Sequence, residues 1–291
     1  MQYDYDYRHD GSKRKAFNEL SRLVFGLDFE PFYASGWWDD SYICHTLFDR
    51  DRAVSNVSVT TMRFMIRGRE QDALQLGTVM THPDYRGKGL AGDLMAKVTK
   101  AYEGKASFRF LFANDSVTGF YPRYGFSERP RYLFSYPFPR DTGRAGRFRL
   151  LDLEKKEDRM VLEGALFSRV PVSESFSLVT GQSIALFHAL YLLSDALLFD
   201  EEEKGILMAA QKGETLHLYD AAYSRKIEWL SLFDRLPFRG IREAVFHFTP
   251  ERGEFPDGEW DVVNEEDDHF FTDAPRGLLP EKFSFPVTGR T

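Results

Sequence analysis

The spacing of apolar side chains changes several times along the first half of the chain, and each spacing indicates a different element. Residues 13–25 place Phe17, Leu20 and Val24 on one face of a helix, for which Ser12 is the predicted N-cap. After this helix the apolar side chains alternate with a period of two. That pattern predicts three strands, at residues 42–48, 53–66 and 74–81.

A short break separates the third strand from a second helix. Proline cannot donate to a strand ladder and disfavours the helical conformation in the residue before it, so His82-Pro83-Asp84 ends the strand. The next apolar side chains recur at every fourth position, which predicts a helix that ends before Gly104. The side chains with this spacing are Leu90, Leu94, Val98 and Tyr102.

The segment between this strand and this helix, R-G-K-G-L-A from Arg86 to Ala91, has the composition of a phosphate-binding turn. Small residues let the backbone approach a ligand. The free N–H groups at the start of a helix, together with the helix dipole, favour an anion. Arg86 and Lys88 add positive charge, so the segment predicts a phosphate site.

Two other phosphate-binding motifs fit this segment less well. Gly87, Gly89 and Gly92 spell G-x-G-x-x-G, which in nicotinamide-dependent enzymes directly follows a strand and precedes an acidic residue by about 20 positions. Here a proline and an arginine separate strand from glycines, and the corresponding region, 108–112, holds no carboxylate. A P-loop would need an earlier glycine and a Ser or Thr after Lys88, and both are absent. A tight turn without function is the remaining alternative.

The first half continues with shorter elements. A strand at 108–112 leads into a short helix that a polar residue at 114–116 caps and that ends at Gly125. A strand at 132–136 follows, and breaker residues predict a linker at about 137–147.

The second half repeats this order loosely. Helices are predicted at 151–163, 183–193 and 227–233, and strands at 196–199, 205–210, 215–221 and 244–249. The segment A-A-Y-S-R-K, at the end of the strand at 215–221, holds no glycine turn. We therefore expect only the first half to bind a phosphate ligand.

Two motifs of the first half resemble those of the GNAT superfamily of acetyl-CoA-dependent N-acetyltransferases. Arg86-x-x-Gly89-x-Ala91, after a strand ending V-x-T-x-P, is similar to the family's pyrophosphate loop. Asn114 and Tyr121 match the family's N-x6-Y-x3-G-F segment, which Gly125-Phe126 completes. Both motifs occur in the expected order.

The resemblance implies an α/β (α+β) GNAT fold, with a mixed central sheet flanked by helices. A second, smaller and degenerate GNAT-like α/β domain without a coenzyme loop would follow. We expect the GNAT acetyltransferase domain at residues 1–140 and the second domain at 141–291.

The resemblance also implies the reaction, in which a primary amine of a small molecule or peptide attacks acetyl-CoA directly in a ternary complex. Backbone N–H groups of Val79, Met80 and Thr81 would hold the acetyl and pantetheine arm. Asn114 would contact the coenzyme, and Tyr121 would protonate the leaving thiolate. The main chain of Arg86, Gly87, Lys88, Gly89, Leu90 and Ala91 would bind the diphosphate.

Residues 28–40 are rich in aromatic and acidic side chains. One interpretation is a packing loop, because aromatic residues mostly serve cores. The other, which the GNAT resemblance implies, is an acceptor wall that holds an ammonium through charge and cation–π contacts. The wall would comprise Phe32, Tyr33, Trp37, Trp38, Asp39 and Asp40. The general base is left open between Asp39 and Asp40, since the isolated His82 is more often structural.

Composition narrows the class of protein. The 291 residues are 43% hydrophobic and 29% charged, as in soluble globular proteins. The sequence lacks an apolar run of membrane-spanning length and does not begin like a signal peptide, so we expect no membrane partner. A single cysteine, Cys44, fits a reducing cytoplasm. No metal-binding spacing occurs among the histidines, so no metal is expected.

The net charge of −7 argues against nucleic-acid binding and allows a cationic amine acceptor. A different class of function stays open beside the enzyme. The chain could be a non-catalytic acyl-CoA-binding sensor or an interaction scaffold whose second half recruits a partner. A homo-oligomer is also left open.

Overall fold

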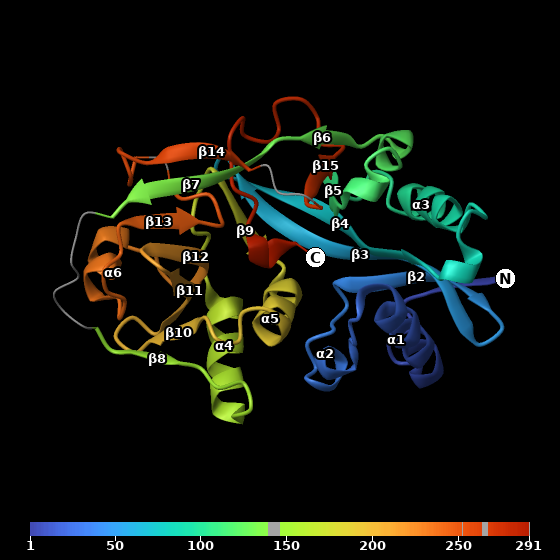
Figure 1. Cartoon of the computed structure of the whole chain (residues 1–291), viewed down its shortest axis with the longest axis horizontal. Helices are drawn as coiled ribbons and strands as arrows, with labels where there is room; N and C mark the ends of the chain where they lie inside the picture. Colours follow the sequence, from blue (N-terminus) through green and yellow to red (C-terminus); the bar gives the residue numbers. More distant parts are fainter. Residues whose placement is uncertain (139–145, 252, 264–266, 291) are drawn as a thin grey trace.

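The computed structural model describes residues 1–138, 146–251, 253–263 and 267–290, which form two mixed β-sheets flanked by helices (Figure 1). The described part of the first sheet has eight strands, and that of the second has seven. The predicted class, a mixed sheet with flanking helices followed by a second and smaller α/β unit, is confirmed.

The first sheet has the order β1-β2-β3-β4-β5-β15-β6, and β9 pairs with the C-terminal end of β3. Neighbouring strands are antiparallel except β4 and β5, which are parallel. The strands are β1 (Gln2–Tyr5), β2 (Tyr42–Asp49), β3 (Arg52–Ile66), β4 (Arg69–Thr81), β5 (Phe108–Ala113), β6 (Ser127–Arg129), β9 (Phe176–Thr180) and β15 (His269–Thr272).

Helices cover both faces of the first sheet (Figure 1). One face carries α1 (Gly11–Phe25) and α2 (Glu30–Ala34), and the other carries α3 (Leu90–Ala101). Three short 3-10 turns complete this half, η1 (Pro83–Tyr85), η2 (Asp115–Val117) and η3 (Tyr121–Tyr124). The last two turns stand where a short helix was predicted.

The N-cap of α1 is Asp10, and the prediction of Ser12 was wrong. The carboxylate of Asp10 accepts hydrogen bonds from the N–H groups of Ser12 and Lys13, at 3.0 and 3.2 Å. The helix therefore begins at Gly11, whereas a cap at Ser12 would have started it at Lys13. Aspartate is as good an N-cap as serine, because its carboxylate also accepts from the free donors of the first turn.

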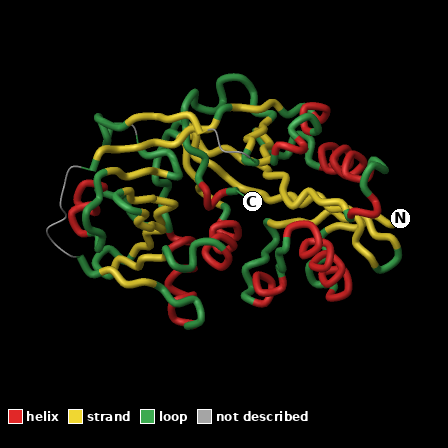
Figure 2. The backbone as a smooth tube through the Cα atoms, viewed as in Figure 1, coloured by secondary structure: helices red, strands yellow, loops and turns green. Residues whose placement is uncertain are grey.

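The second sheet has the order β14-β7-β13-β12-β11-β10-β8. Its strands are β7 (Arg131–Pro137), β8 (Phe148–Leu150), β10 (Leu197–Asp200), β11 (Gly205–Lys212), β12 (Thr215–Ala222), β13 (Glu243–Phe246) and β14 (Glu259–Val263). On one face lie α4 (Lys156–Ser168) and α5 (Gln182–Tyr191), and on the other lies α6 (Trp229–Arg235). Figure 2 separates these helices from the strands that they cover.

The two sheets repeat one pattern and exchange strands. The first sheet is followed from β1 and the second from β8. In each, antiparallel strands lead to a single parallel pair, β4–β5 or β12–β13, and two further antiparallel neighbours follow. The neighbour next to the parallel pair comes from the other half of the chain in both sheets, as β15 in the first and β7 in the second. A division at residue 140 therefore does not separate the sheets, although it separates most of their strands.

The predicted elements of the second half agree with the structure in type and approximate position. The helix expected at 151–163 begins only at Lys156. The short strands β1, β6, β8, β9, β14 and β15 were not predicted. Most of the predicted linker, 139–145, lies outside the described residues.

Candidate active site

Strand β4 leaves its parallel neighbour β5 halfway along its length. The two strands pair only where Ala73 to Gln75 face Phe108 to Phe110. The rest of β4, up to Thr81, keeps its pairing with β3 on the other side. The N–H of His82 donates to the carbonyl oxygen of Val54 at 2.9 Å. Because N–H directions alternate along an antiparallel strand, the N–H of Thr81 points to the opposite, unpaired edge.

A β-bulge occurs in this part of β4. Ser58 of β3 pairs with Gly77 and Asn56 pairs with Met80, so Thr78 and Val79 lie opposite a single residue. Thr78 has a φ of 46°, in the left-handed region that a β-branched residue rarely adopts. The extra residue bends the strand and accompanies its departure from β5.

The turn that follows β4 is built from its own side chains. The N–H of Asp84 donates to Nδ1 of His82 at 3.2 Å. Nε of Arg86 donates to the carbonyl oxygen of Thr81 at 3.3 Å, and Nζ of Lys88 donates to that of Asp84 at 2.8 Å. Both cations therefore stay beside the turn and remain exposed at its surface.

The glycines of the turn have different roles. Gly87 and Gly89 have φ values of 74° and 80°, which require glycine, and a Cβ on either would meet nothing within 4 Å. A Cβ on Gly92 would lie 2.8 Å from the hydroxyl of Tyr124. Gly87 and Gly89 thus shape an open surface, whereas Gly92 lets η3 pack on α3.

The backbone N–H groups from Gly87 to Gly92 have no hydrogen-bond partner among the described residues. Gly89 is the N-cap of α3 and has no side chain to cap it. Residues 86–89 are exposed, whereas Leu90 is buried and Ala91 and Gly92 are half-buried, so the donors of Gly87 to Gly89 face solvent at the positive end of the helix dipole. This is the arrangement that binds a phosphate group.

Tyr121 is in η3, on the α3 face of the first sheet. Its ring packs against Phe271 and Phe120, and 4% of the residue is exposed. Burial raises the pKa of Tyr121 to about 12. Its hydroxyl has no hydrogen-bond partner among the described residues and is not fully enclosed. Tyr121 is therefore a protonated phenol with a free hydroxyl at neutral pH.

Asn114 lies at the C-terminal end of β5 as the residue before η2. Its side chain is exposed, and its Oδ1 accepts a hydrogen bond from the hydroxyl of Ser116 at 2.9 Å. The amide nitrogen of Asn114 points to no described partner and is free to bind a ligand.

The predicted acceptor wall divides into buried and exposed members. Phe32, Trp37 and Trp38 belong to the core, and the two tryptophans are 5% and 4% exposed. Nε1 of Trp37 donates to Glu163 of α4 at 2.6 Å, and Nε1 of Trp38 donates to the carbonyl of Tyr42 at 3.0 Å. These three aromatic side chains have the packing role.

Tyr33, Asp39 and Asp40 keep more of their surface. The guanidinium of Arg14 lies 3.7 Å from the ring centre of Tyr33 and so covers one face of this ring. Asp39 accepts hydrogen bonds from Ser41, and Asp40 pairs with Arg8. These three residues stay predicted contacts of the acceptor.

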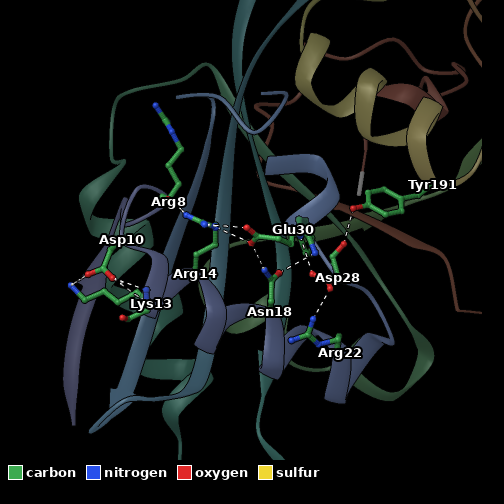
Figure 3. Close-up of polar contacts among 11 residues, drawn as sticks. Arg8, Asp10, Lys13, Arg14, Asn18, Arg22, Asp28, Glu30 and Tyr191 are labelled. Carbon is green, nitrogen blue, oxygen red and sulfur yellow. Dashed lines mark hydrogen bonds and ion pairs between the residues drawn. The ribbon is translucent and has the colours of Figure 1, made fainter. Parts of the chain in front are cut away.

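A polar network that sequence reasoning missed fixes the connection between α1 and α2 (Figure 3). Arg14 and Asn18 of α1 point toward Glu30, with donor–acceptor distances between 2.9 and 3.2 Å. The hydroxyl of Tyr191, at the end of α5, donates to the carbonyl of Asp28 at 2.6 Å. Helix α5 of the second unit thus holds the connection between α1 and α2 of the first. Alternating charge between residues 13 and 30 was the available sequence signal.

His82 has a structural position. It is 5% exposed, its Nδ1 accepts from Asp84, and Arg52 lies against its Nε2. Nδ1 of this buried ring therefore holds the turn by accepting the N–H of Asp84.

Comparison with known proteins decides the family of this site. Residues 9–129 match the model of an acetyltransferase (GNAT) domain. Residues 9–129 are thus similar to a GNAT acetyltransferase domain. The matched stretch contains the splayed strand, the glycine turn and Tyr121, and the family it matches carries out acyl transfer. A search of curated proteins found no match.

Solved structures extend the likeness to both sheets. A probable N-acyltransferase from Enterococcus faecalis V583 has a TM-score of 0.59 at 13% identity, over 93% of this chain and 71% of that one. Eis1 from Mycobacterium abscessus has a TM-score of 0.57 at 12% identity, over 93% and 73%. A GCN5-related N-acetyltransferase from Kribbella flavida has a TM-score of 0.54 at 15% identity, over 94% and 72%. At these identities the likeness shows the fold.

The described residues contain neither a candidate membrane-spanning helix nor a candidate metal-binding group. None of their helices has the length and apolarity to cross a membrane. Within the same residues, no group of three or more histidine, cysteine and acidic side chains is placed to hold a metal ion.

Proposed function

We propose that this protein is an N-acetyltransferase that moves the acetyl group of acetyl-CoA to a primary amine by direct attack in a ternary complex. The observation that carries the proposal is the row of backbone N–H groups from Gly87 to Gly92 without a partner among the described residues, which begins at an exposed turn just after a strand that has left its neighbour. A CoA thioester presents a diphosphate and a carbonyl oxygen. The glycine turn can donate to the diphosphate, and the unpaired edge of β4 can donate to the carbonyl oxygen.

The diphosphate binds to the main chain from Arg86 to Ala91. The positive φ of Gly87 and Gly89 turns successive N–H groups outward, and the dipole of α3 favours a negative charge there. Arg86 and Lys88 flank the turn and add charge. Asn114 contacts the coenzyme from the end of β5.

The acyl group lies along β4, where Val79, Met80 and Thr81 follow the bulge. As the amine attacks, negative charge grows on the carbonyl oxygen. An N–H group on the unpaired edge, such as that of Thr81, stabilises this charge. One donor of this kind typically lowers the barrier by about 3 kcal/mol.

Tyr121 acts as the general acid. Since burial holds its pKa at about 12, the phenol is protonated throughout the physiological range. Its unpartnered hydroxyl donates the proton to the sulfur as the carbon–sulfur bond breaks, which yields CoA as a free thiol. On the acceptor side, Tyr33, Asp39 and Asp40 are the proposed contacts of a cationic amine.

The partners follow from the same site. We propose a primary amine of a small molecule or peptide as acceptor, with neither nucleic acid nor membrane as partner, in a chain of net charge −7. A cytoplasmic location agrees with a single cysteine, Cys44, which is buried and reduced.

The test measures thiol release from acetyl-CoA with a panel of polyamines, aminoglycosides, amino acids and peptides. We expect amine-dependent release by at least one class, together with binding of CoA by calorimetry. Binding of CoA without turnover on any amine would instead indicate an acyl-CoA sensor. Binding of NADH but not of CoA would reject the assignment.

A further inference from the structure

Strand β3 buries a polar face where an apolar one is expected. Asn56, Ser58 and Thr60, alternate residues of one face, are each at most 1% exposed. A strand covered on both sides is ordinarily rich in apolar side chains, and a buried polar group is unfavourable unless it is hydrogen-bonded. Asn56 and Ser58 pair with Met80 and Gly77, the two residues of β4 on either side of the bulge.

Asn56 of β3 and Tyr42 of β2 bind the strained residue of the bulge. Nδ2 of Asn56 donates to the carbonyl oxygen of Thr78 at 2.9 Å. The hydroxyl of Tyr42 and that of Thr78 are 2.6 Å apart. A left-handed conformation is unfavourable for a threonine by about 1–3 kcal/mol, so it persists only where its surroundings hold it. The bonds to Asn56 and Tyr42 supply that restraint.

Asn56 is itself fixed by further bonds. Its Oδ1 accepts from the hydroxyl of Thr46 at 2.7 Å, and its Nδ2 also donates to the hydroxyl of Ser58 at 2.9 Å. The hydroxyl of Tyr7 bonds to Thr46 at the far end of this chain of contacts. Because both ends of the amide are engaged, Asn56 presents its N–H to Thr78 in one orientation.

We propose that Asn56 and Tyr42 are positioning residues for acyl transfer. They hold Thr78 in its left-handed conformation, keep β4 displaced from β5, and so aim the N–H groups after the bulge at the carbonyl oxygen of the thioester. The proposal rests on the proposed function for its consequence, but the conformational part concerns the protein alone.

The kinetic test compares two variants that each remove one buried hydroxyl of the same network. Tyr42→Phe loses the bond to Thr78, whereas Tyr7→Phe loses the bond to Thr46 and does not touch Thr78. For Tyr42→Phe we expect kcat for thiol release to fall about five- to tenfold, as for one lost hydrogen bond, with the Kd for CoA within about twofold of wild type. Tyr7→Phe keeps both bonds to Thr78 and should lower kcat by less than about twofold at a similar loss of Tm. Equal kcat values in the two variants would overturn the proposal.

Substitution of the strained residue tests the conformation directly. Thr78→Val removes the hydroxyl and keeps the branched side chain, so it should lower kcat as Tyr42→Phe does. Thr78→Gly adopts a positive φ without strain and should retain more of the rate than Thr78→Val. The opposite order, with valine the more active, contradicts a restraint of the backbone.

A crystallographic measurement keeps this inference separate from the proposed function. In Asn56→Ala we expect residue 78 to return to negative φ, or the β3–β4 register to lose its shift. An unchanged φ and register overturn the proposal, whatever the activity. A wild-type protein that neither binds CoA nor releases thiol would end the proposed function, while the crystal structure would still decide the role of Asn56.

Discussion

Strand β4 of the first sheet and strand β12 of the second occupy the same place. Each lies between an antiparallel neighbour and a short parallel pairing, which in β12 runs from Thr215 to Leu218 against β13. In each, the antiparallel register shifts near the end of the parallel pairing, at Thr78 in β4 and at Tyr219 in β12. Both sheets therefore splay at the same point.

The splayed ends differ in what surrounds them. The end of β4 leads into an exposed glycine turn with free N–H groups. The end of β12 lies against the chain's own residues. The N–H of Val287 donates to the carbonyl of His247 at 3.1 Å, and the hydroxyl of Thr288 bonds to Asp220. Arg169 also pairs with Asp220 at 2.8 Å, with both side chains buried.

The comparison teaches that sheet topology alone does not make a coenzyme site. Where the first sheet splays, backbone donors are exposed. Where the second splays, polar groups bond to other residues of the chain. Four changes would sharpen or break this distinction, and we take them from the largest expected effect to the smallest.

Asp220→Ala should be the most damaging, because it leaves the guanidinium of Arg169 buried without its partner. We expect the free energy of unfolding in urea to fall by about 3–5 kcal/mol. Should that variant not fold, the double replacement Arg169→Met with Asp220→Leu should restore much of the loss. The exposed pair between Arg63 and Asp72 provides the control, and Asp72→Ala should change little. A small effect of Asp220→Ala would show that the second opening is not held by this pair.

Tyr121→Phe should reduce turnover about a hundredfold and leave CoA affinity nearly intact, because it removes only the proton donor. Any alkaline decline of turnover due to Tyr121 should lie near its raised pKa of about 12, above the ordinary value of 10. The counterpart is Tyr223→Phe in the second sheet, which also removes a buried hydroxyl and should not alter turnover. The measurement is the steady-state rate of thiol release from acetyl-CoA by the two variants. Unchanged turnover in Tyr121→Phe would show that Tyr121 is not the general acid.

Gly89→Val should weaken CoA binding at least about tenfold in calorimetry. The φ of 80° is strained for a branched residue, and its side chain would stand where the diphosphate approaches the turn. Gly104, with a φ of 70° and equally open surroundings, is a matched control. Gly104→Val should lower stability similarly without affecting CoA. Equal affinities in the two variants would place the diphosphate elsewhere.

Gly92→Ala should have the smallest effect. Its Cβ would meet the hydroxyl of Tyr124, the movable end of a side chain, and alanine favours the helix. We expect the free energy of unfolding to change by less than about 1 kcal/mol, and CoA affinity by less than about threefold. Loss of binding in this variant would mean that all three glycines face the ligand, as in a dinucleotide fingerprint.

Local pattern was enough to predict much of the first half. Alternation predicted β2, β3 and β4, and the four-residue spacing after Gly89 predicted α3. The turn from Arg86 to Ala91 and the position of Tyr121 followed from motifs, whose residues are neighbours along the chain. The N-cap at Asp10 was missed because Asp10 and Ser12 are both good capping residues and only the backbone chooses between them.

The acceptor side was less predictable. An aromatic residue has the same sequence signal in a core and in a binding wall, so the burial of Trp37 and Trp38 could not be read in advance. The partners of Trp37, which are Glu163 and Ser183, come from the second half of the chain.

The sequence by itself determined the strands, the helices and the glycine turn, because each depends on side chains a few positions apart. Only the tertiary structure decided three other features: the exchange of β7 and β15 between sheets, the restraint of Thr78 by Tyr42 and Asn56, and the closing of the second opening by Val287 and Thr288. Each joins residues at least 22 positions apart, as Asn56 and Thr78 are. Such contacts depend on which edges and faces meet when the sheets pack, and no local spacing records that choice.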